Sequence, residues 1–168
     1  MQLDLSIQGS SPTSTAVQMA IAEVLEAPWE NWFERWLHRL QGNLPPASTY
    51  ELSLCAVDDL QIQTLNDRFR QQDRPTDVLA FAALEANIPH PEEMPLDLGE
   101  IIISVETAER QAAQRQHPLV AECGWLAAHG LLHLLGWDHP CEDRLMEMLH
   151  QQDILLRDIG LQPPTPLI

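Results

Sequence analysis

The chain has 168 residues, of which 45% are hydrophobic, and this composition predicts one folded domain rather than a disordered chain. Its formal net charge is −16, and all nine basic residues are arginine. Such a surface repels nucleic acid at long range and excludes a polybasic binding footprint, although a local arginine cluster still suits phosphate.

The first part of the chain predicts two strands with a long helical segment between them. Polar and apolar residues alternate over residues 3–7 and again over 50–56, which is the period of a half-buried strand. Residues 16–40 follow a helical period instead, and Pro28 starts a second helical piece within them.

A capping box opens the next helix. Asp58 and Gln61 have its spacing, and the helix that they start runs to about Phe69. Residues 70–77 are polar and typical of a turn-rich loop, and the apolar residues 78–81 predict a short strand.

The second half predicts one more strand and three helices. Residues 85–97 hold prolines and acidic residues, so we expect a surface loop there. The apolar run 98–104 predicts a strand covered on both faces. Helices are expected over 105–116, 119–135 and 142–159, followed by a proline-rich tail over 160–168. The pattern indicates a single α+β (mixed α/β) domain over 1–168, with roughly four strands and about five helices.

We expect neither a membrane span nor a secretory signal, because the sequence lacks an apolar run of about 18 residues and a basic N-terminal region. The three cysteines, Cys55, Cys123 and Cys141, are odd in number and far apart. They argue against a disulfide framework and favour a reducing, cytoplasmic compartment.

Three histidines in the run from His129 to His139 are the leading candidates for a functional site. His129 and His133 are four residues apart, which places both rings on one helix face. Gly136 then ends the helix by taking a positive φ, and His139 returns as a third nitrogen ligand. Three neutral imidazoles suit Zn²⁺, or another first-row ion such as Ni²⁺, and leave a coordination position for water.

The same spacing is typical of metzincin proteases, which carry a glutamate after the first histidine as general base. Gly130 occupies that position here, which speaks against a protease. A cluster of hydrogen-bonded histidines on a core helix, without a metal, is the non-functional alternative.

Together with two upstream segments, the histidine run resembles the YbeY family of bacterial endoribonucleases. The similar segments lie within 65–81, 98–104 and 129–139, and the resemblance covers roughly residues 48–158. Trp137 stands where the family usually has tyrosine, Ala80 where it usually has serine, and Glu100 where it usually has aspartate. None of these departures removes a proposed ligand.

The resemblance implies a metal-dependent, single-strand-specific endoribonuclease that matures the 3′ end of small-subunit ribosomal RNA and acts in ribosome quality control. It maps His129, His133 and His139 onto metal ligands, and Arg70 onto a functionally required arginine. The implied partners are ribosomal RNA and the small ribosomal subunit, in the cytoplasm, with no DNA and no membrane.

The residue chemistry alone leaves several roles open. Arg70 either stabilises charge on a phosphate or caps the helix that ends near it. Asp138 either orients a histidine, replaces the missing base or is an ordinary turn residue. Whether Glu100 reaches the site is also open. Competing functions are a metalloprotease-like hydrolase and a non-enzymatic ribosome-associated module whose structural metal is closed by Cys141 or Asp138.

Overall fold

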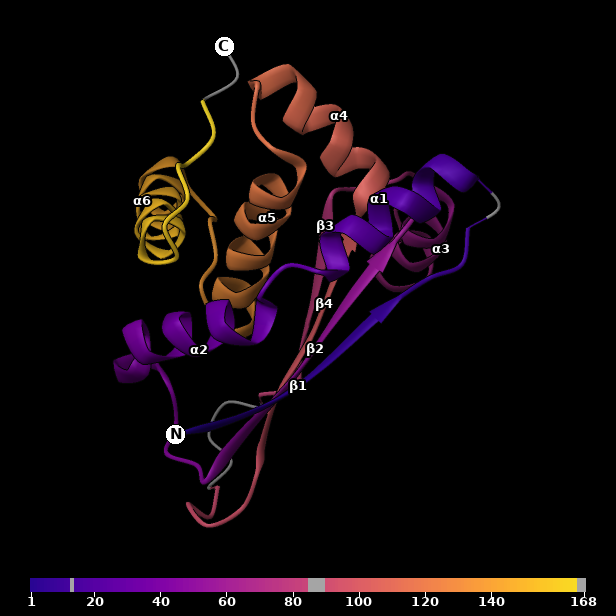
Figure 1. The fold of residues 1–168 in the computed structure, drawn as a ribbon. Helices are drawn as coiled ribbons and strands as arrows, with labels where there is room; N and C mark the ends of the chain where they lie inside the picture. The colour runs from indigo at the N-terminus through magenta and orange to yellow at the C-terminus, as the bar shows by residue number, and fades with distance from the viewer. Residues whose placement is uncertain (13, 85–89, 166–168) are drawn as a thin grey trace.

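The computed structural model describes residues 1–12, 14–84 and 90–165. Within these ranges the chain forms a four-stranded sheet and six α-helices, which confirms the predicted α+β class (Figure 1). Residues 85–89 of the predicted acidic loop and 166–168 of the predicted tail lie outside the described residues. None of the described helices combines the length and hydropathy that a bilayer-spanning helix needs.

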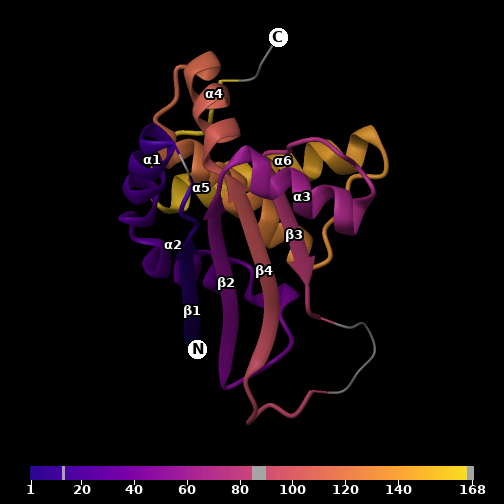
Figure 2. The same ribbon diagram turned by 90° about the vertical axis from the view of Figure 1, so that its right-hand side faces the viewer.

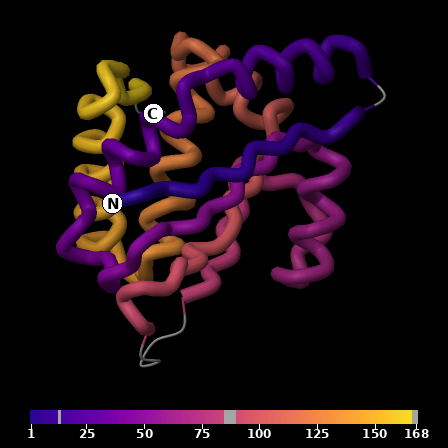
Figure 3. Tube along the Cα trace, turned by 60° about the horizontal axis from the view of Figure 1, so that its bottom comes forward, coloured from indigo at the N-terminus to yellow at the C-terminus, as the bar shows by residue number. Residues whose placement is uncertain are grey.

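The sheet is mixed, with β3 at one edge and β1 at the other. Its strands are β1 (Gln2–Gly9), β2 (Thr49–Val57), β3 (Val78–Ala82) and β4 (Leu96–Ser104), in the spatial order β1-β2-β4-β3. β1, β2 and β4 run parallel, whereas β3 runs antiparallel to β4 and places Phe81 opposite Glu100. Figure 3 shows the chain leaving β1 through two helices before it returns beside it as β2.

The predicted helices are present, and the long helical segment before β2 is two helices. The predicted start of a second helical piece at Pro28 is confirmed, and the described α-helices number six where about five were expected. The helices are α1 (Thr15–Leu25), α2 (Trp29–Arg39), α3 (Asp59–Arg70), α4 (Val105–Arg115), α5 (Leu119–Leu134) and α6 (Glu142–Asp158), with a short 3₁₀ helix at Gln41–Asn43.

Helices cover the two faces of the sheet unequally. Figure 2 shows α3 in front of one end of the sheet and α5 and α6 behind it. The main core lies on the side of α5 and contains Ile101 and Ile103, whereas Ile102 packs with Ile62 of α3 on the opposite face. Alternate residues of β4 therefore serve two separate cores.

Two details of β4 differ from the prediction. The strand begins at Leu96, so the end of the predicted loop is already strand. Glu100 is exposed, so the strand is not covered on both faces along its whole length. α3 covers only one end of that face (Figure 2), which accounts for the exposure of Glu100.

Candidate metal centre

Helix α5 presents two histidines from adjacent turns. Most of its side chains are buried, and it packs on β3 and β4, so close packing fixes its position on the sheet. His129 and His133 point the same way, and their Nε2 atoms lie 3.0 Å apart. The prediction that both rings share one helix face is confirmed.

The end of α5 returns the chain towards these rings. Gly136 has φ +95° and its N–H donates to the carbonyl of His133, while the N–H of Trp137 donates to the carbonyl of Leu132. This pair of bonds is a Schellman motif, which requires a residue with positive φ at the glycine position. His139 follows, and one ring nitrogen from each of His129, His133 and His139 lies within 4.8 Å of the other two.

The hydrogen-bond partners of two rings leave Nε2 as the free ligand atom. Nδ1 of His133 faces the carbonyl oxygen of Trp137 at 2.9 Å, which only accepts, so Nδ1 carries the proton. Nδ1 of His129 faces Oε1 of Gln152 at 3.2 Å, and the amide N–H of Gln152 is already donated to the carbonyl of Trp125. Outer partners of this kind fix the tautomer and orientation of metal ligands.

The donor set fits a cation. With protons on both Nδ1 atoms, the lone pairs on Nε2 of His129 and His133 face each other across 3.0 Å. Two lone pairs at this distance repel unless a cation or proton lies between them. Burial lowers the pKa of both imidazoles, which favours the neutral form that binds metal. Three neutral nitrogens suit Zn²⁺ or Ni²⁺.

The histidines open into a cleft of about 780 Å³ whose other wall is β3. Arg70, the last residue of α3, also lines this cleft. Its Nη2 donates to the carbonyl of Ala80 at 2.9 Å, and its guanidinium lies over the ring of Phe81. The end of α3 is capped instead by backbone bonds of Gln71, so Arg70 does not act as the helix cap.

The packing of α5 on the sheet explains why a glycine, Gly130, stands where metzincin proteases carry their glutamate base. A Cβ atom built there would lie 2.8 Å from Cγ2 of Ile101 on β4. A side chain at this position would therefore overpack the contact with the sheet unless α5 or Ile101 shifted. The close packing of α5 on β4, which positions His129, thus disfavours a glutamate at position 130.

Other residues considered from the sequence occupy different places. Oδ1 of Asp138 accepts the N–H of His139 at 2.8 Å, so this carboxylate shapes the turn that carries the third histidine. Among the described residues, neither Asp138 nor Cys141 joins the cluster of potential ligands.

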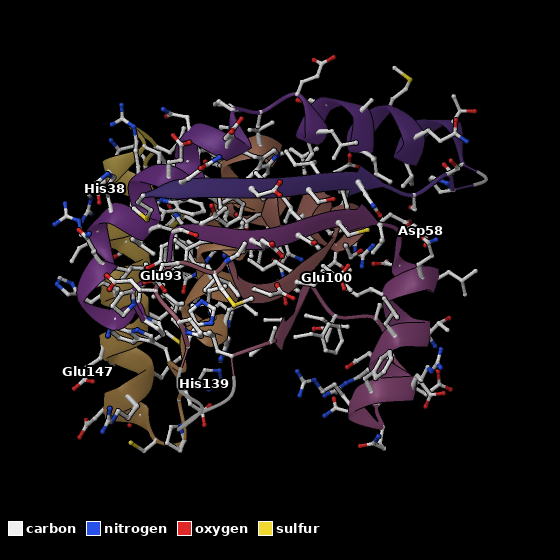
Figure 4. All side chains as sticks on the ribbon, turned by 90° about the horizontal axis from the view of Figure 1, so that it is seen from below. His38, Asp58, Glu93, Glu100, His139 and Glu147 are labelled. Atoms are coloured by element: carbon white, nitrogen blue, oxygen red, sulfur yellow. The ribbon has the colours of Figure 1, made fainter. Side chains whose placement is uncertain are left out.

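Glu100 lies on the sheet face opposite α5, because its neighbour Ile101 faces α5, and Figure 4 shows it away from His139. Gln152 could not be identified from the sequence as a partner of His129, because no sequence signal connects it with a histidine 23 residues earlier.

A family model and relatives of known name indicate the same family for this chain. A family model described as "Endoribonuclease YbeY" matches residues 16–160. Proteins named Endoribonuclease YbeY from Trichormus variabilis and Synechocystis are each 51% identical to this chain, with 96% of it covered in both cases. The alignments cover 97% and 93% of those relatives. The solution structure of TM1509 from Thermotoga maritima superimposes with a TM-score of 0.57 at 25% identity, covering 93% of this chain and 89% of the other.

Proposed function

The chain belongs to the YbeY family of endoribonucleases, and from this premise we propose that it cleaves single-stranded RNA with a metal ion bound by His129, His133 and His139. The observation that carries the proposal is the pair of free Nε2 atoms of His129 and His133. These atoms lie 3.0 Å apart at a cleft that also contains Arg70. We propose Zn²⁺ as the ion, with Ni²⁺ as the first-row alternative.

The chemistry divides between the metal and the arginine. A bound Zn²⁺ ion supplies Lewis-acid polarisation of a phosphoryl oxygen and lowers the pKa of water. The guanidinium of Arg70 stabilises the negative charge that develops on the non-bridging oxygens. Its bond to Ala80 and its contact with Phe81 hold it against β3, and the remaining N–H groups are available to a phosphate.

An open coordination position supports a catalytic rather than a structural metal. Among the described residues the ligand cluster has three members, so a fourth position is left for water or substrate. A closed site would need a fourth protein ligand, and the carboxylate of Asp138 is engaged with the backbone of His139 instead.

The segment that contributes Arg70 to the cleft is less acidic than the chain as a whole, which supports RNA binding there. Residues 67–77, which include Arg70, contain three arginines and three aspartates, so this segment is neutral although the chain carries −16. Among the described residues, Arg68, Arg70 and Arg74 make no ion pair with a carboxylate. We propose small-subunit ribosomal RNA as the substrate, the small ribosomal subunit as the partner and the cytoplasm as the compartment.

The test is a cleavage assay on a single-stranded fragment of ribosomal RNA, with the metal content of each preparation measured by elemental analysis. His133→Ala should lose both the metal and the cleavage, whereas His150→Ala, which removes a histidine outside the cluster, should retain both. Equal cleavage by wild type and His133→Ala would identify a contaminating nuclease and contradict the proposal.

A further inference from the structure

A second cavity adjoins the histidine cluster. Its volume is about 430 Å³, and its lining includes Trp137, Asp138, Arg144 and Glu147. Asp138 lines both this cavity and the main cleft, so both border the turn that carries His139. Resting on the proposed ribonuclease function, we propose that this cavity is a nucleotide subsite: Trp137 stacks on a base of the RNA, and Arg144 binds a neighbouring phosphate.

Trp137 has the properties of a stacking platform. Its ring is partly buried and packs against the main core, so one part is fixed and the rest lines the cavity. Its backbone is held at both ends, because the N–H donates to Leu132 and the carbonyl accepts from His133. A base can stack on a fixed indole whatever its identity, since every base has a π-face.

Arg144 has the properties of a phosphate ligand. It lies in the first turn of α6, is exposed, and makes no ion pair with a carboxylate of the described residues. The arginines at positions 39, 110 and 115, in contrast, are paired with acidic side chains. A guanidinium offers two parallel N–H groups to a phosphate, which an ammonium group cannot do.

The other polar groups of the cavity suit a base edge rather than a second phosphate. Glu147 and Asn43 line it beside Arg144. A carboxylate repels phosphate but accepts hydrogen bonds from the amino group of a base, and an amide donates and accepts. The cavity therefore offers one group that suits a phosphate and others that suit a base.

The position of the cavity defines a path for the bound RNA strand. Figure 4 shows His139 between α6, which carries Glu147, and α3, whose last residue is Arg70. An RNA strand whose reacting phosphate lies at the histidines contacts Arg70 on one side. On the other side it enters the cavity lined by Trp137 and Arg144. Binding on both sides holds the scissile phosphate in place at the histidines.

The experiment measures binding of a fluorescein-labelled single-stranded RNA 12-mer by anisotropy, with a chelator present so that no cleavage occurs. Arg144→Gln should weaken binding about fivefold or more, because one phosphate contact is lost. Trp137→Leu should weaken it about tenfold, whereas Trp137→Phe keeps a stacking ring and should stay near wild type. Arg157→Gln is the matched control: it removes an equal charge from the same helix about 20 Å further along and should change binding less than twofold.

A truncation series ties the effect to this cavity. The RNA is shortened by one nucleotide at a time from each end, and one end should show a step loss of affinity in wild type. That step should disappear in the Arg144→Gln, Trp137→Leu double variant, which no longer holds the missing nucleotide. A step of equal size in both proteins would overturn the subsite, as would equal binding by Arg144→Gln and Arg157→Gln.

The outcomes separate this inference from the proposed function. Wild type that neither binds nor cleaves the RNA would remove the function and the subsite together. Wild type that cleaves, with Arg144→Gln behaving as Arg157→Gln does, would remove the subsite alone. Arg144 is exposed, so its variant folds even where a Trp137 variant does not.

Discussion

Gln152 on α6 accepts a hydrogen bond from Nδ1 of His129 on α5, with 3.2 Å between the two atoms. Gln152 is buried, and its N–H group is held by the carbonyl of Trp125, so its oxygen cannot turn away from the histidine. The C-terminal helix thus sets the ring orientation of a candidate ligand on another helix.

Gln152→Leu should therefore weaken metal binding about 10- to 100-fold, the usual range for an outer partner of a metal ligand. Competition with a chromophoric chelator measures the affinity. Gln151→Leu changes the adjacent residue, which makes no hydrogen bond to a histidine of the cluster among the described residues, and should bind metal like wild type. Equal affinities for the two variants would show that Gln152 has no role in orienting His129.

Gly130→Ala should destabilise the protein by up to about 2 kcal/mol, because the new methyl group would overpack the contact with Ile101. Overpacking costs about 1 to 3 kcal/mol, of which the gain that alanine brings to a helix offsets about 1 kcal/mol. Gly124→Ala is the control in the same helix, since its nearest neighbours are 3.4 Å away, and it should be neutral or stabilising. Urea unfolding measures both, and a stabilised Gly130→Ala variant would show that α5 is free to move off β4.

Glu122 is buried between Arg115 at 3.0 Å and His117 at 2.8 Å, and His117 also contacts the carbonyl of Gln162. Glu122→Gln should lower the free energy of unfolding by about 3 kcal/mol, because it leaves the partly buried guanidinium of Arg115 without its counter-charge. Glu109→Gln makes the same change at an exposed position of α4 and should stay within about 0.5 kcal/mol of wild type. Two similar unfolding curves would refute the structural importance of this cluster.

The pKa of Asp59 lies below its ordinary value. Burial raises it, but hydrogen bonds from Ser104 and Thr107 and the ion pair with Arg110 outweigh burial. A lowered pKa in the folded state means stability that is present above the unfolded pKa and lost as the pH falls through the folded one.

Asp59→Asn should consequently cost about 1 kcal/mol at pH 7, and the difference from wild type should shrink as the pH falls below about 4. Urea unfolding of both proteins between pH 7 and pH 3 provides the measurement, with Asp67→Asn, an exposed change on the same helix, as control. A difference that stays constant over this pH range would mean that the charge of Asp59 contributes nothing.

Much of the candidate site is local in sequence and was predictable for that reason. His129 and His133 share a helix face through their spacing alone, and Gly136 marks the turn through its positive φ. The capping box of Asp58 was equally visible, and its side chain does accept the N–H of Gln61 at 2.8 Å.

The remaining features depend on tertiary packing. Gln152 meets His129 only because α6 packs on α5. Arg70 reaches Ala80 only because β3 forms the edge of the sheet beside the end of α3. The exposure of Glu100 follows from how far α3 extends over the sheet, which no periodicity in β4 reports.

The bond between Arg70 and Ala80 has a second consequence, for solubility. β3 is an edge strand, and the carbonyl of Ala80 is one of the groups that another chain's strand would use to extend the sheet. The bulky, charged side chain that occupies this carbonyl also blocks such strand addition. Loss of Arg70 would thus expose a template for self-association, so lost activity in an Arg70 variant reports on chemistry only while the protein remains monodisperse.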